Sequence, residues 1–304
     1  MAKYIVKRIL LAILTIFIVS VITFFAMNLI PGGPFNTEKA MSPAVIAALN
    51  ERYGLDDPVP VQYVNYMKRL LTELDFGVCL KTGRDVWVTI TTGLKVSARL
   101  GLSAAALALV CGVVLGSIAA LNRGKIIDRL VVFFTTLATS VPSFVLATLL
   151  LLIFSIQLEL IPAWSAENPN YILPVISLAM YPMAYITRLT KTSMLDALGQ
   201  DYVRTARAKG VMPYKVIFKH ALRNALIPVI TYAGPMVAYI ITGSMVVETI
   251  FSIGGLGSSF VTSINNLDYT LIMGVTLFLA FLMVTANLIT DIIYKLVDPR
   301  ISFD

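Results

Sequence analysis

Long uncharged runs of hydrophobic residues divide the chain into about six segments that are long enough to cross a lipid bilayer. A membrane-spanning helix needs about 20 mostly apolar residues. The runs cover residues 9–30, 100–121, 130–158, 171–187, 225–247 and 269–290, and the run 171–187 is the shortest. The pattern predicts an all-α integral membrane protein with about six transmembrane helices.

The first run resembles a secretory signal because Lys3, Lys7 and Arg8 precede it as a positively charged segment. Its apolar part exceeds the roughly 7–15 residues of a signal peptide, and no A-x-A cleavage site follows it. The segment 31–34, Pro-Gly-Gly-Pro, follows instead and is typical of a turn. We therefore expect a retained transmembrane helix over residues 1–30, which forms the first domain.

Basic residues set the expected orientation. They gather before the first run, between the second and third, between the fourth and fifth, and after the sixth: Lys3, Lys7, Arg8, Arg123, Lys125, Arg129, Arg188, Lys191, Arg204, Arg207, Lys209, Lys215, Lys219, Arg223, Lys295 and Arg300. The loops 159–170 and 250–268 contain no lysine or arginine. Cytoplasmic loops carry the excess of positive charge. We therefore expect both termini in the cytoplasm.

Residues 31–99 form the second expected domain, an ordered extracytoplasmic loop. Its basic residues do not oppose this placement, because loops longer than about 60 residues translocate largely regardless of charge. Ser42 is a suitable N-cap and Pro43 a suitable first residue for a helix that reaches Arg52. A second helix is expected from Val61 to Leu74, after the interruption at residues 57–60.

Composition agrees with a membrane protein. Of the 304 residues, 58% are hydrophobic and 13% charged, whereas soluble domains carry roughly 25% charged residues. The net charge of +7 is explained by cytoplasmic loops, and we expect no nucleic-acid partner. Cys79, Cys111 and the single histidine, His220, lack the spacing of a metal site. No metal, no cofactor bound by this chain and no catalytic residues are expected.

The roles of the small residues and of the prolines in the membrane helices can each be interpreted in two ways. Gly112 and Gly116 form a G-x-x-x-G pattern, which lets helix backbones approach closely, either within this chain or against a partner subunit. Prolines lie in or beside the helices, where they either kink the walls of a path or serve packing alone: Pro142, Pro182, Pro228 and Pro235.

The basic segment between the fourth and fifth runs contains clear start and stop signals for helices. Asp201 is a good N-cap for a short helix over residues 202–209, and Gly210 is a good residue to end it. Pro213 then begins a helix that re-enters the membrane near Pro228. A helix of about 12 Å is marginal alone in water and needs a packing partner. The spacing of the residues favours two packing partners equally: a groove on a partner protein, or anionic lipid headgroups.

This segment resembles the EAA loop of ABC importer permeases. The resemblance rests on Arg-Thr-Ala-Arg-Ala-Lys-Gly at 204–210 and on His-Ala-Leu-Arg-Asn-Ala-Leu-Ile-Pro at 220–228. In that family the loop docks on the ATPase subunit. The resemblance therefore implies ATPase coupling for Arg204, Thr205, Ala206, Arg207, Ala208, Lys209 and Gly210. The family's glutamate is absent, since Arg204 stands in its place.

Further motifs extend the resemblance to the B-type permease of oligopeptide systems. They are Pro-Gly-Gly-Pro-Phe at 31–35, Tyr-Gly-Leu-Asp-Asp-Pro at 53–58, Asp-Phe-Gly at 75–77, Ile-Thr-Gly-Ser at 241–244, Glu-Thr-Ile-Phe at 248–251, Gly-Leu-Gly at 255–257 and Asp-Pro-Arg at 298–300. Gly254 departs from the family, which usually has proline there. The motifs occur in the family's order and cover nearly the whole chain.

The resemblance implies a type I ABC importer permease fold, with residues 100–304 as a five-helix core and a coupling loop at about 190–225. It also implies half of a translocation path for peptides, completed by partner subunits. Those partners are a homologous second permease subunit, two ATPase subunits that use ATP and Mg, and an extracytoplasmic substrate-binding protein. The location implied is the plasma membrane of a prokaryote. Dipeptide, glutathione and nickel permeases of the same family are the alternatives.

Two rival classes, an ion-coupled secondary transporter and a membrane-embedded enzyme, fit less well, the enzyme because the sequence shows no polar or metal-binding constellation. The chain has no G-x-x-x-x-G-K-[ST] loop, so it cannot hydrolyse ATP by that route. An ion-coupled transporter usually has ionisable groups near mid-membrane, where these runs are nearly uncharged. We expect Glu248, beside the apolar Phe251, to form a gate or to contact the binding protein. Tyr185, Ser244 and Asn287 are expected either to line the path or to bond between helices.

Overall fold

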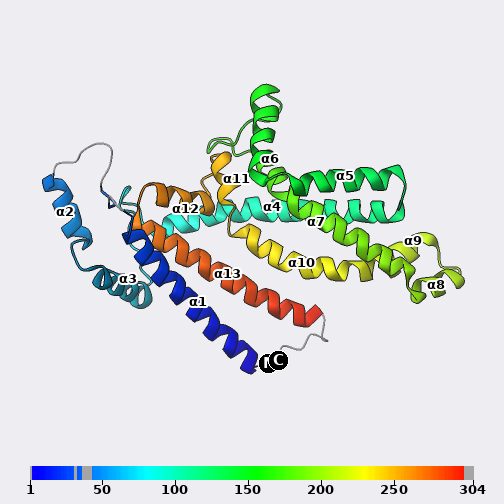
Figure 1. Ribbon diagram of the computed structural model, residues 1–304, viewed down its shortest axis with the longest axis horizontal. Helices are drawn as coiled ribbons and strands as arrows, with labels where there is room; N and C mark the ends of the chain where they lie inside the picture. Colours follow the sequence, from blue (N-terminus) through cyan, green and yellow to red (C-terminus); the bar gives the residue numbers. More distant parts are fainter. Residues whose placement is uncertain (1, 31–32, 36–42, 298–304) are drawn as a thin grey trace. The chain divides into compact units, whose positions relative to one another are not determined.

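The computed structural model describes residues 2–30, 33–35 and 43–297. This part is nearly all helical, which confirms the predicted fold class, apart from loops and one bridge between Val78 and Asp85. The helices in Figure 1 are α1 (Ala2–Asn28), α2 (Pro43–Tyr53), α3 (Val59–Glu73), α4 (Val86–Leu121), α5 (Ile126–Ser140), α6 (Ser143–Leu150), η1 (Leu151–Gln157), α7 (Ile172–Gly199), α8 (Asp201–Ala208), α9 (Pro213–Lys215), η2 (Val216–Leu222), α10 (Arg223–Ile241), α11 (Met245–Ile250), α12 (Leu256–Asn265) and α13 (Tyr269–Val297).

The number of membrane spans agrees with the sequence. Within the described part, five helical stretches are long and apolar enough to cross a bilayer, and a bent pair makes up to six. The bent pair is α5 followed by α6 and η1, and the helix direction changes by 104° between the two parts. The expected third span, 130–158, is therefore not one straight helix.

Pro142 explains this bend. A proline disfavours the helical conformation in the residue before it, and Val141 is extended, with φ −84° and ψ 126°. Helix α5 ends at Ser140, and α6 begins at Ser143 in a new direction. Pro142 is thus a break between helices, which is stronger than the kink considered from the sequence.

Helix α7 is longer than the expected fourth span. It runs to Gly199, twelve residues beyond the predicted end at Thr187. The added part is polar, but its side chains have partners on α5. Arg188 donates to the carbonyl of Thr135 at 3.2 Å and to the hydroxyl of Thr139. These contacts allow the helix to continue past the hydrophobic run.

The described chain forms two compact units. Unit 1 contains residues 2–30, 33–35, 43–96 and 254–288, and unit 2 contains residues 97–253 and 289–297. Helices α4 and α13 each contribute to both units. The domain division expected at residues 30 and 99 was drawn from membrane topology alone, and it stays a prediction.

Unit 1 contains the predicted cap helices. Helix α2 begins at Pro43, while its expected N-cap, Ser42, lies outside the described residues. Helix α3 begins at Val59, two residues before its predicted start, with a proline in its first turn. The Ser20 hydroxyl of α1 lies 2.8 Å from the Tyr63 hydroxyl of α3. Buried Phe24, Met27, Tyr66, Ile272 and Met273 form the core under the cap.

Close contact between α4 and α7 organises unit 2. A β-carbon on Gly112 would lie 2.7 Å from the Ile186 side chain, and one on Gly116 would lie 2.5 Å from the Thr187 carbonyl oxygen. The G-x-x-x-G pattern therefore serves packing within this chain. Buried small residues of α4 extend the contact to α10, in a cluster of Ala104, Ala105, Ala108, Ala179, Ile186, Val229, Met236 and Ile240.

Replacing Gly116 by alanine tests this packing. The new methyl group meets backbone, which cannot rotate away. Overpacking costs about 1–3 kcal/mol, and the better helix propensity of alanine returns up to about 1 kcal/mol. We expect Gly116→Ala to lower the free energy of unfolding in a fixed detergent by about 1–2 kcal/mol. Gly199→Ala is the control, because no atom lies within 4 Å of its added carbon. Equal stability of the two variants would contradict the close contact.

Candidate functional site

The predicted short helix of the basic segment is present as α8. It spans Asp201–Ala208, one residue earlier at each end than expected. The residue before it, Gln200, is extended and serves as N-cap without a side-chain hydrogen bond, so Asp201 is the first helical residue and not the cap. Asp201 still suits the first turn, where negative charge stabilises the helix dipole.

Gly210 ends the helix as predicted. Its φ of +73° is a left-handed conformation that glycine adopts without steric cost. The Gly210 N–H donates to the carbonyl of Arg207 at 3.0 Å, and the Val211 N–H donates to that of Ala206 at 3.1 Å. Both hydrogen bonds together define a Schellman motif. The helix therefore has a well-defined end at Gly210.

The inner face of α8 packs against its own loop. Val203 is 0% exposed and Ala206 is 7% exposed. Both belong to a small hydrophobic cluster with Val216 of η2 and the partly buried Val211. Ala206 is thus part of the core of the loop, so its small size is required inside this chain.

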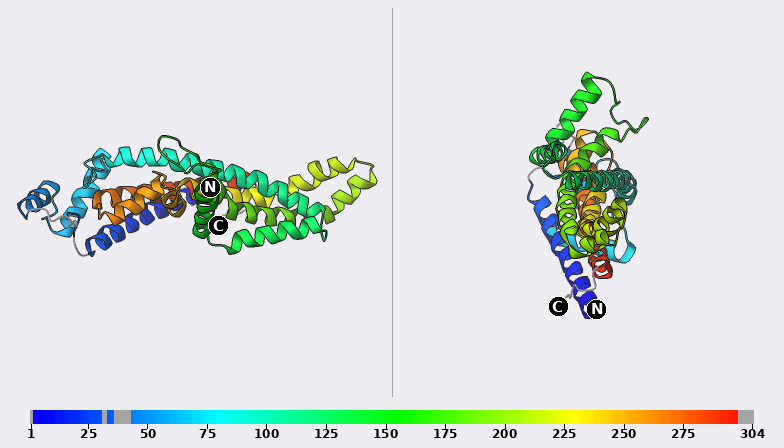
Figure 2. Two further views of the ribbon diagram at one scale, coloured as in Figure 1. Left: turned by 90° about the horizontal axis from the view of Figure 1, so that it is seen from above. Right: turned by 90° about the vertical axis from the view of Figure 1, so that its right-hand side faces the viewer.

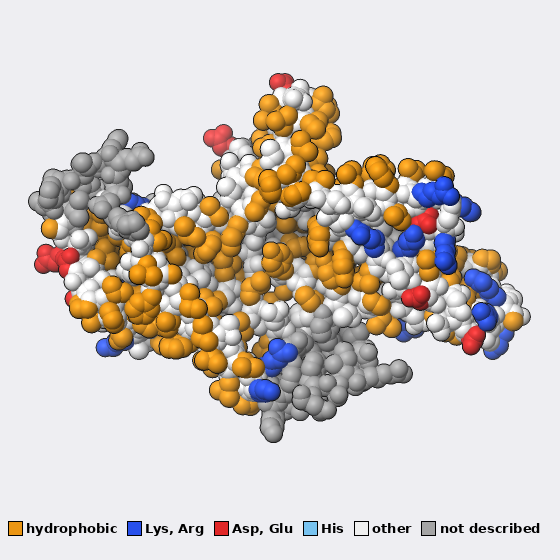
Figure 3. All heavy atoms as spheres, in the orientation of Figure 1, with side chains coloured by type: hydrophobic (Ala, Val, Ile, Leu, Met, Phe, Trp, Pro, Cys, Tyr) orange, Lys and Arg blue, Asp and Glu red, His pale blue; other side chains and the backbone are white. Residues whose placement is uncertain are grey.

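The outer face of α8 is exposed and positively charged. Arg204, Thr205, Arg207, Ala208 and Lys209 are all exposed. Arg204 pairs with Asp201 at 3.5 Å, but the arginine side chain is 74% exposed, so the pair adds little stability. In Figure 3, lysine and arginine side chains gather at the end of unit 2 that holds α8 and the turn between α4 and α5. This face can attract an acidic surface.

The loop is joined to the bundle by buried residues, most of them alanines. Met194 and Ala197 of α7 pack with Ala120 of α4, Ala221 of η2 and Ala225 of α10. As predicted, a helix starts at Pro213, and it continues through the π-helical η2 into α10. Figures 1 and 2 show α8 and α9 beyond the C-terminal end of α7. A force on α8 therefore acts directly on two long helices.

An ion pair near this loop was missed by the sequence reasoning. The Lys191 ammonium of α7 lies 2.5 Å from the Asp128 carboxylate of α5, and both side chains are largely buried. Asp128 also accepts a hydrogen bond from the Gly124 N–H at 3.0 Å. The available signal was a single acidic residue in the basic segment 123–129. The pair fixes the α4–α5 turn to the helix that carries α8.

Three of the expected gate or path residues lie together around α11. Glu248 is 0% exposed and accepts a 2.7 Å hydrogen bond from the Ser97 hydroxyl of α4. Phe251 is 3% exposed, and Ser244 caps α11 by accepting from the Val247 N–H at 3.2 Å. In this structure Glu248 is therefore not at a surface where it could contact a binding protein. Its role as a gate stays a prediction.

The other two expected path residues lie elsewhere. Tyr185 of α7 pairs with Tyr232 of α10, with ring centroids 4.3 Å apart. Asn287 is exposed on α13, in unit 1. The described residues contain no group of three or more histidine, cysteine, aspartate or glutamate side chains placed to hold a metal ion. The buried Cys79 is a free thiol whose pKa is raised, chiefly by burial and also by nearby Asp268, so it is a poor nucleophile.

Two family models match this chain and show its class of protein. A model described as the binding-protein-dependent transport system inner membrane component matches residues 112–303. A second model, for the N-terminal part of such membrane components, matches residues 1–95. The chain belongs to this family. It is therefore a multi-pass inner membrane protein of a binding-protein-dependent transport system, and α8 lies within the matched region.

Curated relatives of this membrane component are peptide permease proteins. The dipeptide transport system permease protein DppB of Bacillus subtilis is 46% identical over 304 residues, which cover 99% of this chain and 98% of the relative. The oligopeptide transport system permease protein OppB of Haemophilus influenzae is 42% identical over the full length of both chains. That of Salmonella typhimurium is 41% identical, also over the full length of both. These relatives are permease subunits, so this chain is a transport subunit and not an enzyme.

A solved structure shares the fold of this membrane component. A chain of the MetNI methionine ABC transporter, in an inward-facing conformation, matches with a TM-score of 0.55 and 16% identity. The match covers 70% of this chain and 97% of that chain. It confirms the expected ABC importer permease fold.

The end of α8 provides a test of the loop geometry. Gly210→Ala places a side chain at a φ of +73°, which costs roughly 1–2 kcal/mol. We expect faster amide hydrogen exchange throughout α8, measured by mass spectrometry. Gly210→Asn is the matched control, because asparagine tolerates this conformation better, and its exchange should lie between alanine and the wild type. If alanine and asparagine have the same effect, the left-handed conformation is not what fixes the helix end.

Proposed function

We propose that this chain is a permease subunit of an ATP-driven peptide importer and that α8 docks on a separate ATPase subunit. The observation that carries the proposal is the two-sided character of α8. Val203 and Ala206 hold the helix on its own loop, while Arg204, Arg207 and Ala208 face outward without covering. A helix that rests on lipid buries its apolar face in the bilayer, but the apolar face of α8 is already covered by its own loop, and this favours a protein partner for the exposed basic face.

The energy source follows from the sequence. The chain lacks a P-loop, so the energy comes from another polypeptide or an ion gradient, and the resemblance to ABC importer permeases favours two ATPase subunits that use ATP and Mg. Their closure on ATP displaces α8, and α7 and α10 carry the movement into the membrane part. A homologous second permease subunit completes the path. The two-state change is driven by contacts that differ between the two conformations.

The distribution of charge supports the proposed topology. The α4–α5 turn and the α8 loop are rich in arginine and lysine, whereas 159–170 and 250–268 have none. Under the positive-inside rule, α8 and both termini lie in the cytoplasm of a prokaryote. Unit 1 then carries its cap on the outer side, where an extracytoplasmic binding protein delivers the substrate.

Peptide is the proposed substrate class because the relatives carry dipeptide or oligopeptide in their names. Oligopeptide import is the first choice on the motifs of the B-type permease. Dipeptide import is the second candidate, favoured by the 46% identity to DppB against 41–42% to the two OppB proteins.

Bulky substitutions on the two faces of α8 test the docking. Ala208→Trp adds an indole to the outer face and should prevent the ATPase subunits from copurifying with the permease, while α8 stays folded. We expect peptide uptake into proteoliposomes to fall by about tenfold or more, as for loss of an interface hot spot. Ala206→Trp instead disrupts the inner cluster and should increase hydrogen exchange in α8. Normal uptake and copurification with Ala208→Trp would show that α8 is not the docking helix.

Charge reversal provides an independent test. Arg204→Glu with Arg207→Glu should slow association with the ATPase subunits and weaken uptake more strongly at low salt, because complementary charges steer binding. Arg123→Glu with Lys125→Glu makes the same change of net charge in the α4–α5 turn and serves as the control. The proposal requires the α8 pair to be the more damaging; equal effects would assign the basic face to lipid.

A further inference from the structure

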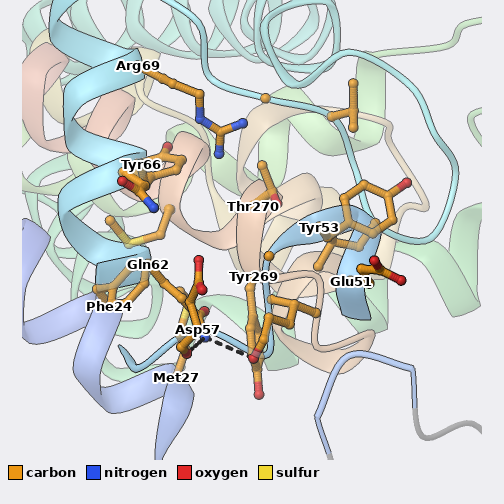
Figure 4. A pocket seen from close by; sticks show the side chains of 17 residues that line it. Phe24, Met27, Glu51, Tyr53, Asp57, Gln62, Tyr66, Arg69, Tyr269 and Thr270 are labelled. Carbon is orange, nitrogen blue, oxygen red and sulfur yellow. Dashed lines mark hydrogen bonds between the residues drawn. The ribbon is translucent and has the colours of Figure 1, made fainter. Parts of the chain in front are cut away.

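Unit 1 contains a cavity, open to solvent, that the proposed coupling does not use. Its volume is about 430 Å³, within the roughly 300–1,000 Å³ of small-molecule sites. Figure 4 shows its lining, which comes from α1, α2, α3, the turn between α2 and α3, the segment 77–80 after α3, and α13. All of these belong to unit 1.

The cavity has charges of both signs at separate places. Arg69 extends from α3, whereas Glu51 comes from the last turn of α2 and Asp57 from the following turn. In Figure 4 the guanidinium and the two carboxylates approach the cavity from different sides. All three side chains are exposed to solvent. Their charges therefore remain available to a ligand.

The position of Asp57 is fixed by hydrogen bonds. The Gln62 side-chain amide donates to the carbonyls of Leu55 at 3.0 Å and of Asp57 at 2.8 Å, as the dashed lines in Figure 4 show. Gly54 ends α2 with a φ of +66°, and the Leu55 N–H donates to the Asn50 carbonyl at 2.9 Å. The backbone of the turn that carries Asp57 is therefore preformed.

A buried hydroxyl in the lining lacks a partner. Tyr66 is 6% exposed, and its hydroxyl has no hydrogen-bond partner among the described residues. Leaving such a group unsatisfied usually costs about 1–3 kcal/mol, and buried polar groups are rarely left so. Burial raises the pKa of this hydroxyl, so it keeps its proton at neutral pH and can donate to a ligand.

The chemistry of the lining selects the ligand class. Two carboxylates against one guanidinium disfavour an anion such as a phosphate. The charged groups disfavour a lipid tail, and two carboxylates are few for a metal ion. The rings of Phe24, Tyr53 and Tyr269 provide apolar surface between the charges. A molecule with one carboxylate, one ammonium and an apolar body satisfies all of these groups.

We propose that this cavity binds a small zwitterion of the size of an amino acid or dipeptide. Its carboxylate meets Arg69 and the Tyr66 hydroxyl, since guanidinium binds carboxylate with charge-assisted hydrogen bonds. Its ammonium group meets Glu51 and Asp57. The inference rests on unit 1 alone and does not require the proposed ATPase docking.

Binding of the dipeptide Ala-Phe to the full-length chain in lipid nanodiscs tests the proposal. Protection of amides in α2 and α3 from hydrogen exchange locates the bound dipeptide and gives its affinity. We expect protection that saturates, and affinity that falls about tenfold in Arg69→Gln. Lys68→Gln is the control, because Lys68 is the exposed neighbour on α3 and does not line the cavity.

Blocked peptides assign the two ends. The C-terminal amide of Ala-Phe should bind the wild type about tenfold more weakly, and Arg69→Gln should add little to that loss, because both changes remove one interaction. N-acetyl-Ala-Phe, in which the ammonium group is blocked, should likewise bind the wild type more weakly. The double variant Glu51→Gln, Asp57→Asn should add little to that loss of affinity. If the loss of affinity from blocking one end of the peptide and the loss from the matching variant simply add, the proposed contact of that end is wrong.

Tyr66→Phe separates a ligand donor from a structural hydroxyl. The variant removes only the orphaned group, so the ligand-free protein should melt at a slightly higher temperature while Ala-Phe binds more weakly. A lower melting temperature with unchanged affinity would overturn the role of Tyr66. Absence of protection in α2 and α3 at up to about 10 mM Ala-Phe would overturn the site itself.

Discussion

Direct contact between the backbones of α4 and α7 positions most of unit 2. At Gly112 and Gly116 the two helices leave no space for a β-carbon. Inside a bilayer, helices gain little by moving apolar side chains out of lipid, so close van der Waals packing takes over the role of the hydrophobic effect. Because α7 leads directly into α8, this contact also determines where the basic helix is presented.

The membrane helices could be predicted because their signal is local. An uninterrupted apolar run identifies a span whatever the run packs against. The bend between α5 and α6 could not be read in this way, since hydropathy does not change across Val141 and Pro142. The extension of α7 to Gly199 depends on Arg188 and Lys191 finding Thr135, Thr139 and Asp128 on another helix, and such long-range partners have no signature in the sequence.

The same distinction applies to the candidate site. Gly210 was predictable because the requirement for a left-handed residue is local. The burial of Ala206 could have been inferred from its three-residue spacing to Val203, which places both on one helix face. The burial of Glu248 was not predictable, because its hydrogen-bond donor, Ser97, lies 151 residues away in the sequence. What the structure adds to the sequence analysis is therefore mainly the contacts between side chains that are distant in the sequence.

The uninterrupted course of α9, η2 and α10 has a mechanical consequence. From Pro213 to Ile241 the chain forms one rod of roughly 40 Å at 1.5 Å per residue, so a tilt of about 10° at one end displaces the other by roughly 7 Å. Pro228 and Pro235 lie inside this rod, and each removes a backbone hydrogen bond. A movement at the Pro213 end is therefore transmitted to Ile241 only in part. The remainder is taken up by bending of the helix at Pro228 and Pro235.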